Sequence, residues 1–188
     1  MSDQYGLPTL IESSEPAEPR SAVSDALHGA FERISLDDKS IREHWLQRLL
    51  FQRPELIPIE NTDQVFAPLR PLAREVSTGV GSIDLLCVSP SGFLTIVETK
   101  LHRNPESRRE VLGQIFDYCA QLSKWSYDDL RSAVASASHR ANEHADPLLF
   151  AAKGDSASLG EQQRFRASVS ECLLHGRFMM VIVGDGFR

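Results

Sequence analysis

Residues 81–118 constrain the fold of this chain more than any other part of the sequence. The segment opens with an apolar, β-branched run over residues 83–88, which predicts a strand. Residues 89–92, Ser-Pro-Ser-Gly, have the composition of a turn. A second strand is expected over residues 93–99, and a helix follows. The pattern therefore predicts an antiparallel hairpin packed beside a helix.

Charged residues interrupt both strands of this hairpin. Asp84 lies in the first strand, and Glu98 and Lys100 end the second, where the alternation of side chains puts them on one face. A register that places Asp84 opposite Glu98 also pairs Leu86 with Ile96. Two carboxylates and an ammonium group then meet at one end of the sheet.

Two adjacent carboxylates repel each other, and burial raises that cost. A hard divalent cation such as Mg²⁺ removes the repulsion and keeps water ligands for a phosphate substrate. The sequence thus favours Asp84 and Glu98 as metal ligands, with Lys100 acting on an attacking water or on charge at phosphorus. The alternative is a turn-ending Asp84 and a surface ion pair between Glu98 and Lys100.

The motif residues are Asp84, Glu98-Thr99-Lys100, Gln114 and Tyr118. Together they resemble the PD-(D/E)XK nuclease superfamily with its Gln-x3-Tyr extension, although the first motif lacks the proline that names the group. The resemblance implies an α/β fold with a restriction-endonuclease-like αβββαβ core, a mixed central sheet flanked by helices, over about residues 40–183.

The resemblance also implies a metal-dependent endonuclease that hydrolyses DNA with Mg²⁺ or Mn²⁺. Asp84 and Glu98 would bind the metal together with the backbone carbonyl of Thr99, and Gln114 would support the catalytic site. Glu43 and Gln47, one turn apart on a helix expected over residues 40–53, would point toward these carboxylates, and Glu43 is a third candidate metal ligand. Its alternative role is to complete a capping box with the residue at the start of that helix.

Candidate DNA contacts follow Lys100 along the chain: Arg103, Arg108, Arg109 and Tyr118. A helix expected to begin at residues 104–105 would place the middle two arginines near the positive end of its dipole, where phosphate binds well. The net charge of −6 argues against a protein that coats nucleic acid generally. Phosphate contacts need local positive charge rather than a basic protein.

An acidic tail over residues 1–20 is expected to be disordered. Residues 21–188 suit one domain, and the possibility that this domain is a fragment of a longer protein stays open. The three cysteines read as reduced thiols of a cytoplasmic protein, and no apolar run is long enough to span a membrane. The sequence does not define the oligomeric state, and a homodimer is one of the open alternatives. A zinc site is disfavoured by the spacing of its candidate ligands: His139, His144, Cys172 and His175.

Several further elements are expected. A strand is predicted over residues 72–77, a short helix from a Ser126 cap to residue 137, a loop over residues 141–160, a helix over residues 161–175 and a buried strand over residues 178–183. The helix after Lys100 should bury one apolar face: Val111, Leu112, Ile115, Phe116, Cys119 and Leu122.

Two other functions remain open at this point. The fold could serve a nucleic-acid-binding module that has lost turnover, against which the intact Asp84, Glu98 and Lys100 argue. It could also serve a protein-interaction domain, for which the acidic tail is the only indication. Metal-dependent cleavage separates the nuclease from both.

Overall fold

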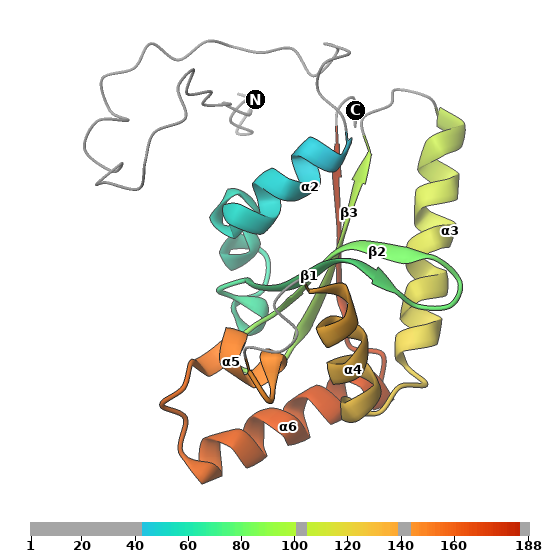
Figure 1. Ribbon diagram of the computed structural model, residues 1–188. Helices are drawn as coiled ribbons and strands as arrows, with labels where there is room; N and C mark the ends of the chain where they lie inside the picture. Colours follow the sequence, from blue (N-terminus) through green and yellow to red (C-terminus); the bar gives the residue numbers. More distant parts are fainter. Residues whose placement is uncertain (1–42, 101–104, 139–143, 185–188) are drawn as a thin grey trace, which may run out of the picture. The chain divides into compact units, whose positions relative to one another are not determined.

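The computed structural model describes residues 43–100, 105–138 and 144–184, which form a mixed α/β fold (Figure 1). One sheet has the spatial order β1-β2-β3-β4, and its strands are β1 Arg70–Ser77, β2 Ser82–Val88, β3 Leu94–Lys100 and β4 Met179–Gly184. The flanking helices are α2 Glu43–Gln52, α3 Pro105–Leu122, α4 Tyr127–Ala137, α5 Pro147–Lys153 and α6 Leu159–Leu174. Three 3-10 turns connect α2 to β1: Pro54–Leu56, Ile59–Asn61 and Gln64–Phe66.

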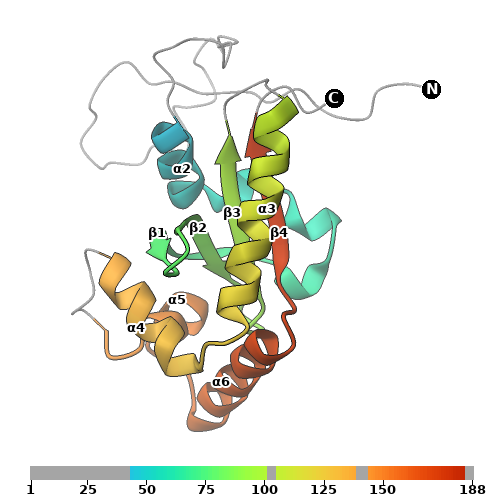
Figure 2. The same cartoon turned by 90° about the vertical axis from the view of Figure 1, so that its right-hand side faces the viewer.

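The sheet is mixed, as the sequence predicts. Strands β1, β2 and β3 form an antiparallel meander, and β4 returns parallel to β3. Helices α2 and α3 lie on opposite sides of β3 and β4 (Figure 2). The expected α/β class is therefore confirmed.

The predicted register of the central hairpin is also confirmed. Leu86 pairs with Ile96, and the pairing continues to Leu85 and Val97 at the open end of the hairpin. The next position in this register brings Asp84 opposite Glu98. Apolar residues on both strands fix that register, because a slip of one residue would turn every buried side chain to the other face.

The β1–β2 hairpin brings a further acidic residue, Glu75, near the two carboxylates. The register changes by one residue at a bulge between Pro71 and Ala73, after which Arg74 pairs with Leu85 and Val76 with Ile83. Glu75 and Asp84 lie between these two pairs, and the charge of Glu75 acts on Glu98. Glu75 has a φ of 54°, the one positive φ among the described non-glycine residues.

The core forms where β1, β2 and β3 meet α3, α4, α5 and α6. Its buried members include, from the strands, Val76, Leu86, Val88, Leu94 and Ile96 and, from the helices, Leu122, Leu130, Val134, Leu148, Phe165 and Val169. These strand residues alternate along each strand and so share one face of the sheet. The other face of β2 and β3 is buried as well, with Leu85, Cys87 and Val97 fully covered. None of the described helices is long and apolar enough to cross a membrane.

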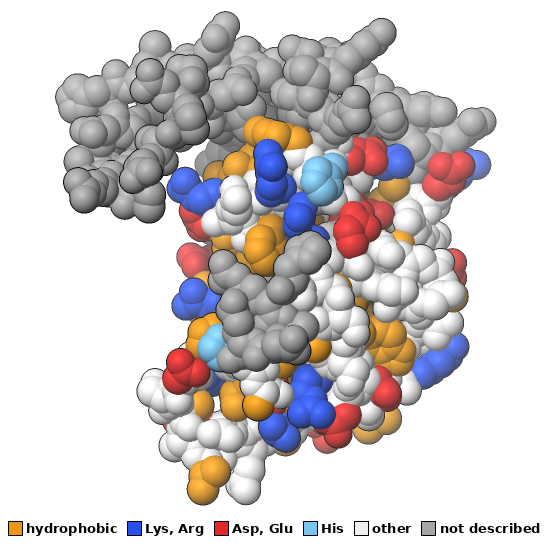
Figure 3. Space-filling view, viewed as in Figure 1, with side chains coloured by type: hydrophobic (Ala, Val, Ile, Leu, Met, Phe, Trp, Pro, Cys, Tyr) orange, Lys and Arg blue, Asp and Glu red, His pale blue; other side chains and the backbone are white. Residues whose placement is uncertain are grey.

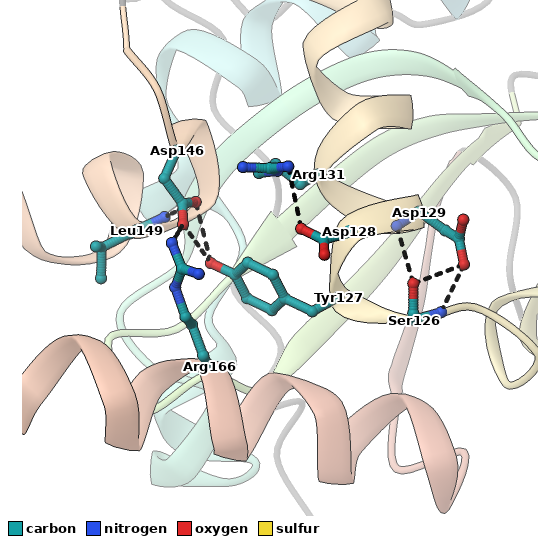
Figure 4. Close-up of polar contacts among 8 residues, drawn as sticks. All are labelled: Ser126, Tyr127, Asp128, Asp129, Arg131, Asp146, Leu149 and Arg166. Atoms are coloured by element: carbon teal, nitrogen blue, oxygen red, sulfur yellow. Dashed lines mark hydrogen bonds and ion pairs between the residues drawn. The ribbon is translucent and has the colours of Figure 1, made fainter.

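A polar cluster joins α4, α5 and α6 at the edge of this core (Figure 4). Asp146 accepts hydrogen bonds from the Tyr127 hydroxyl at 3.0 Å and from the Leu149 backbone N–H, and it pairs with Arg166 at 2.7 Å. Asp146 thereby caps α5 and links α4 and α6 to it. A loop is predicted over residues 141–160, but Asp146 and Pro147 start α5 within it.

Two other expectations are wrong in detail. Helix α3 buries Val111, Ile115 and the residues that continue their stripe, whereas Leu112 is 49% exposed and Phe116 is 60% exposed. Each of the exposed pair is one position from a buried residue, a rotation of about 100° that turns it away from the sheet. Strand β4 is only partly buried, because it is the last strand of the sheet and has one neighbour.

Candidate active site

The Asp84 carboxylate is fixed by the neighbouring strand. Its Oδ2 accepts a hydrogen bond from the Thr99 backbone N–H at 2.8 Å and another from the Thr99 hydroxyl at 2.7 Å. Burial raises the pKa of Asp84, and the negative charge of Glu43 adds to that rise, while the Thr99 bonds and a hydrogen bond from the Gln47 amide oppose it. The group therefore favours its protonated form more than an exposed aspartate does.

Glu98 is more deeply buried, with 5% of its surface exposed. Burial first, and then the charge of Asp84, raise the pKa of Glu98 to about 8. The negative charge of Glu75 also raises this pKa, whereas a hydrogen bond from the Asp84 backbone N–H and the positive charge of Lys100 lower it. Glu98 Oε2 is buried and has no hydrogen-bond partner among the described residues. A buried carboxylate oxygen without a partner is costly.

Lys100 and Glu43 form an ion pair at the rim of the site. The Lys100 Nζ lies 3.6 Å from Glu43 Oε1, and both side chains are about one third exposed. Helix α2 therefore turns Glu43 toward the motif residues. The capping box proposed for Glu43 needs Ser40, which lies outside the described residues. Glu43 is the first residue of α2 in the structure, where a negative charge also suits the helix dipole.

Tyr118 and Gln114 form a short hydrogen-bonded chain between α3 and the β1–β2 hairpin. Gln114 Nε2 donates to the Tyr118 hydroxyl at 2.7 Å, and that hydroxyl donates to the Ser82 carbonyl at 2.8 Å. A Cβ at Gly81 would lie 3.0 Å from the Tyr118 hydroxyl oxygen, so glycine there allows the close approach. Tyr118 is fully buried and offers no surface to a nucleic acid, so its predicted role as a DNA contact is wrong.

The predicted cationic contacts are only partly described. Arg109 is exposed on α3, whereas Arg103 and the Arg108 side chain lie outside the described residues. Figure 3 shows further basic side chains over α2, where Arg48 is exposed. Helix α2 thus contributes Glu43 to the site and positive charge to the adjacent surface.

The disfavoured zinc ligands do not meet in the part of the chain that can be described. His144 stacks on Phe150, His175 pairs with Glu171, and the Cys172 thiol donates to a backbone carbonyl. His139 lies outside the described residues. Among the described residues, no group of three or more His, Cys, Asp or Glu side chains is arranged to bind a metal ion.

One residue near the site carries no clear signal in the sequence. Glu75 is brought toward Glu98 only by the β1–β2 register and its bulge, which periodicity does not predict. Gln47 is 6% exposed and hydrogen bonds to Asp84, and its place one helical turn after Glu43 predicts that it points toward the carboxylates. The structure therefore adds one carboxylate to the predicted set.

Comparison with protein-family models, curated proteins and solved structures finds no match for this chain.

Proposed function

We propose that this chain is a metal-dependent nuclease, an endonuclease that hydrolyses phosphodiester bonds in DNA. One observation carries the proposal: the buried Glu98 has an unpartnered Oε2 beside Asp84. A hard divalent cation is the ligand that best relieves this arrangement, because it takes carboxylate oxygens and stabilises the ionised form of both groups.

The order of the elements supports a restriction-endonuclease-like core. Helix α2, the β1–β2–β3 meander, α3 and the parallel β4 follow the order αβββαβ, with α4, α5 and α6 inserted before the last strand. This agreement concerns fold, and fold alone does not define an activity. The function therefore rests on the side chains at the open end of the β2–β3 hairpin.

The donor set fits Mg²⁺ or Mn²⁺, which would be held by Asp84 and Glu98, with Glu43 and the Thr99 carbonyl as further candidate ligands. Such an ion, when bound, supplies Lewis-acid stabilisation of negative charge on a phosphoryl group. Thr99 fixes the direction of the Asp84 carboxylate through its two hydrogen bonds.

The other side chains act on the substrate and its surroundings. Lys100 presents an ammonium group that can orient water and stabilise charge developing on phosphorus. Gln114 acts indirectly, because its hydrogen bond to Tyr118 helps to fix the hairpin that carries Asp84. Arg48 and Arg109 are exposed cations available to the DNA backbone.

The direct test is incubation of the purified chain with labelled duplex, single-stranded and branched DNA and with RNA, in Mg²⁺, in Mn²⁺ and in EDTA. We expect cleavage of DNA that requires the metal and is lost in Asp84→Asn and Glu98→Gln. Glu171→Gln, which changes an exposed carboxylate on α6 that pairs with His175, is the matched control and should cleave normally. Salt-dependent DNA binding without cleavage by the wild type would favour the inactive binding module instead.

A further inference from the structure

Two buried oxygen atoms that lack partners flank Asp84. One is Glu98 Oε2, and the other is Gln47 Oε1 on α2. Glu98 accepts a hydrogen bond from the Asp84 backbone N–H, and the Gln47 amide bonds to the Asp84 carboxylate. Both unpartnered oxygens thus belong to side chains in contact with the same aspartate.

The orientation of the Gln47 amide follows from its chemistry. An ionised carboxylate only accepts hydrogen bonds, so the NH₂ group of Gln47 must face Asp84. The oxygen of the same amide takes no part in that bond, and it lies buried without a hydrogen-bond partner among the described residues. A buried acceptor without a partner lowers the stability of the fold. An apolar side chain of similar size would fill the same space without this cost, so packing alone does not explain a glutamine here.

We propose that Gln47 belongs to the divalent-cation site, where its NH₂ group orients Asp84 and its Oε1 is a neutral oxygen donor to the cation. This inference rests on the proposed function, since it concerns the same site. Amide oxygens are suitable donors to hard cations, and a neutral donor adds a ligand without a further negative charge beside Asp84 and Glu98.

The test compares Gln47→Leu with the wild type in two measurements on the full chain: Mn²⁺ binding by calorimetry, and thermal unfolding in EDTA and in excess Mn²⁺. We expect Gln47→Leu to bind Mn²⁺ about 10- to 100-fold more weakly, the range typical of groups that orient ligands. In EDTA two effects oppose each other, because the change removes an unpaired buried acceptor and also the hydrogen bond to Asp84, so the melting temperature should shift by only a few degrees. A large loss of Mn²⁺ affinity beside a small shift in EDTA separates a site residue from a structural one.

Two more variants complete the design. Gln47→Glu loses the NH₂ group, as the leucine variant does, but retains an oxygen donor of the same length, so it should bind Mn²⁺ more tightly than Gln47→Leu. Gln52→Leu, on an exposed position of the same helix, is the control and should bind as the wild type does.

Equal Mn²⁺ affinities of wild type and Gln47→Leu would overturn the inference alone. Binding by Gln47→Glu as weak as that of the leucine variant would overturn the donor role of Oε1. A wild type that binds no Mn²⁺ would overturn the inference together with the proposed function.

Discussion

Thr99 donates two hydrogen bonds to one oxygen of Asp84, from its backbone N–H and from its hydroxyl. The donor residue lies on β3 and the acceptor on β2, so the hairpin register itself sets the direction of the carboxylate. A carboxylate held by backbone geometry is pre-organised, and it loses little side-chain entropy when it binds a ligand. The site therefore depends on strand pairing more than on flexible surface contacts.

The pH dependence of stability should report on Glu98. Its pKa is raised from 4.5 to about 8, so in this range the folded protein keeps a proton that the unfolded chain releases. The contribution of Glu98 to the free energy of unfolding of EDTA-treated protein should therefore be largest below pH 4.5 and fall as the pH rises toward 8, with a slope of at most about 1.4 kcal/mol per pH unit.

Urea unfolding of wild type and Glu98→Gln at several pH values measures this effect. The variant cannot titrate at position 98 and should lose most of the slope between pH 5 and about 8. Parallel pH profiles for the two proteins would contradict the raised pKa.

The chain of hydrogen bonds through Tyr118 predicts a loss of stability without a loss of fold. Tyr118→Phe keeps the buried ring but removes the bond to the Ser82 carbonyl, and it should lower the free energy of unfolding by about 1 kcal/mol. Gln114→Ala is the matched comparison, since Gln114 is exposed and water can replace its amide. An equal cost for the two variants in denaturant unfolding would contradict the structural role assigned to the Ser82 bond.

The sequence predicts the hairpin well because two apolar runs flank a short turn there. The condition that Asp84 lie opposite Glu98 selects the register that pairs Leu86 with Ile96, and the structure has this pairing. The exposed Leu112 and Phe116 could not be predicted in the same way. A helical period tells which residues share a stripe, but the contact with the sheet decides how wide the buried stripe is.

The site extends beyond the motif for a similar reason. Glu75 approaches Glu98 through the bulge that shifts the β1–β2 register. This is a long-range relation between segments with no motif of their own. Local patterns in a single sequence contain little information about it.

The backbone at Glu75 yields a prediction that concerns conformation rather than charge. A φ of 54° is unfavourable for residues with a Cβ and favourable for glycine. Glu75→Gly and Glu75→Ala both remove the carboxylate, so the difference between them isolates the backbone. We expect the glycine variant to be the more stable by about 1 kcal/mol in urea unfolding. Within an ordinary strand the order is the reverse, so an alanine variant of equal or greater stability would contradict the strained conformation.

Lys100 separates a nuclease from a protein that only binds DNA and metal. The lysine is a cation at the rim of a carboxylate site and pairs with Glu43 at 3.6 Å, so it cannot itself be a metal ligand while protonated. Removing it should leave Mn²⁺ affinity unchanged or slightly stronger, because repulsion between two cations disappears. DNA affinity should fall little, since one phosphate contact among several is lost.

Cleavage should respond very differently to the same change. Lys100→Ala should slow single-turnover cleavage by roughly 10²- to 10⁴-fold, the range for a positioned acid–base or electrostatic group. Lys124→Ala, at an exposed position after α3, provides the matched loss of one positive charge and should cleave at the wild-type rate. Rates are measured beside Mn²⁺ titrations of the same preparations, so that a metal-binding defect cannot pass for a catalytic one. Equal cleavage rates for Lys100→Ala and wild type would remove this lysine from the mechanism, because its charge would then act on neither the water nor the phosphorus.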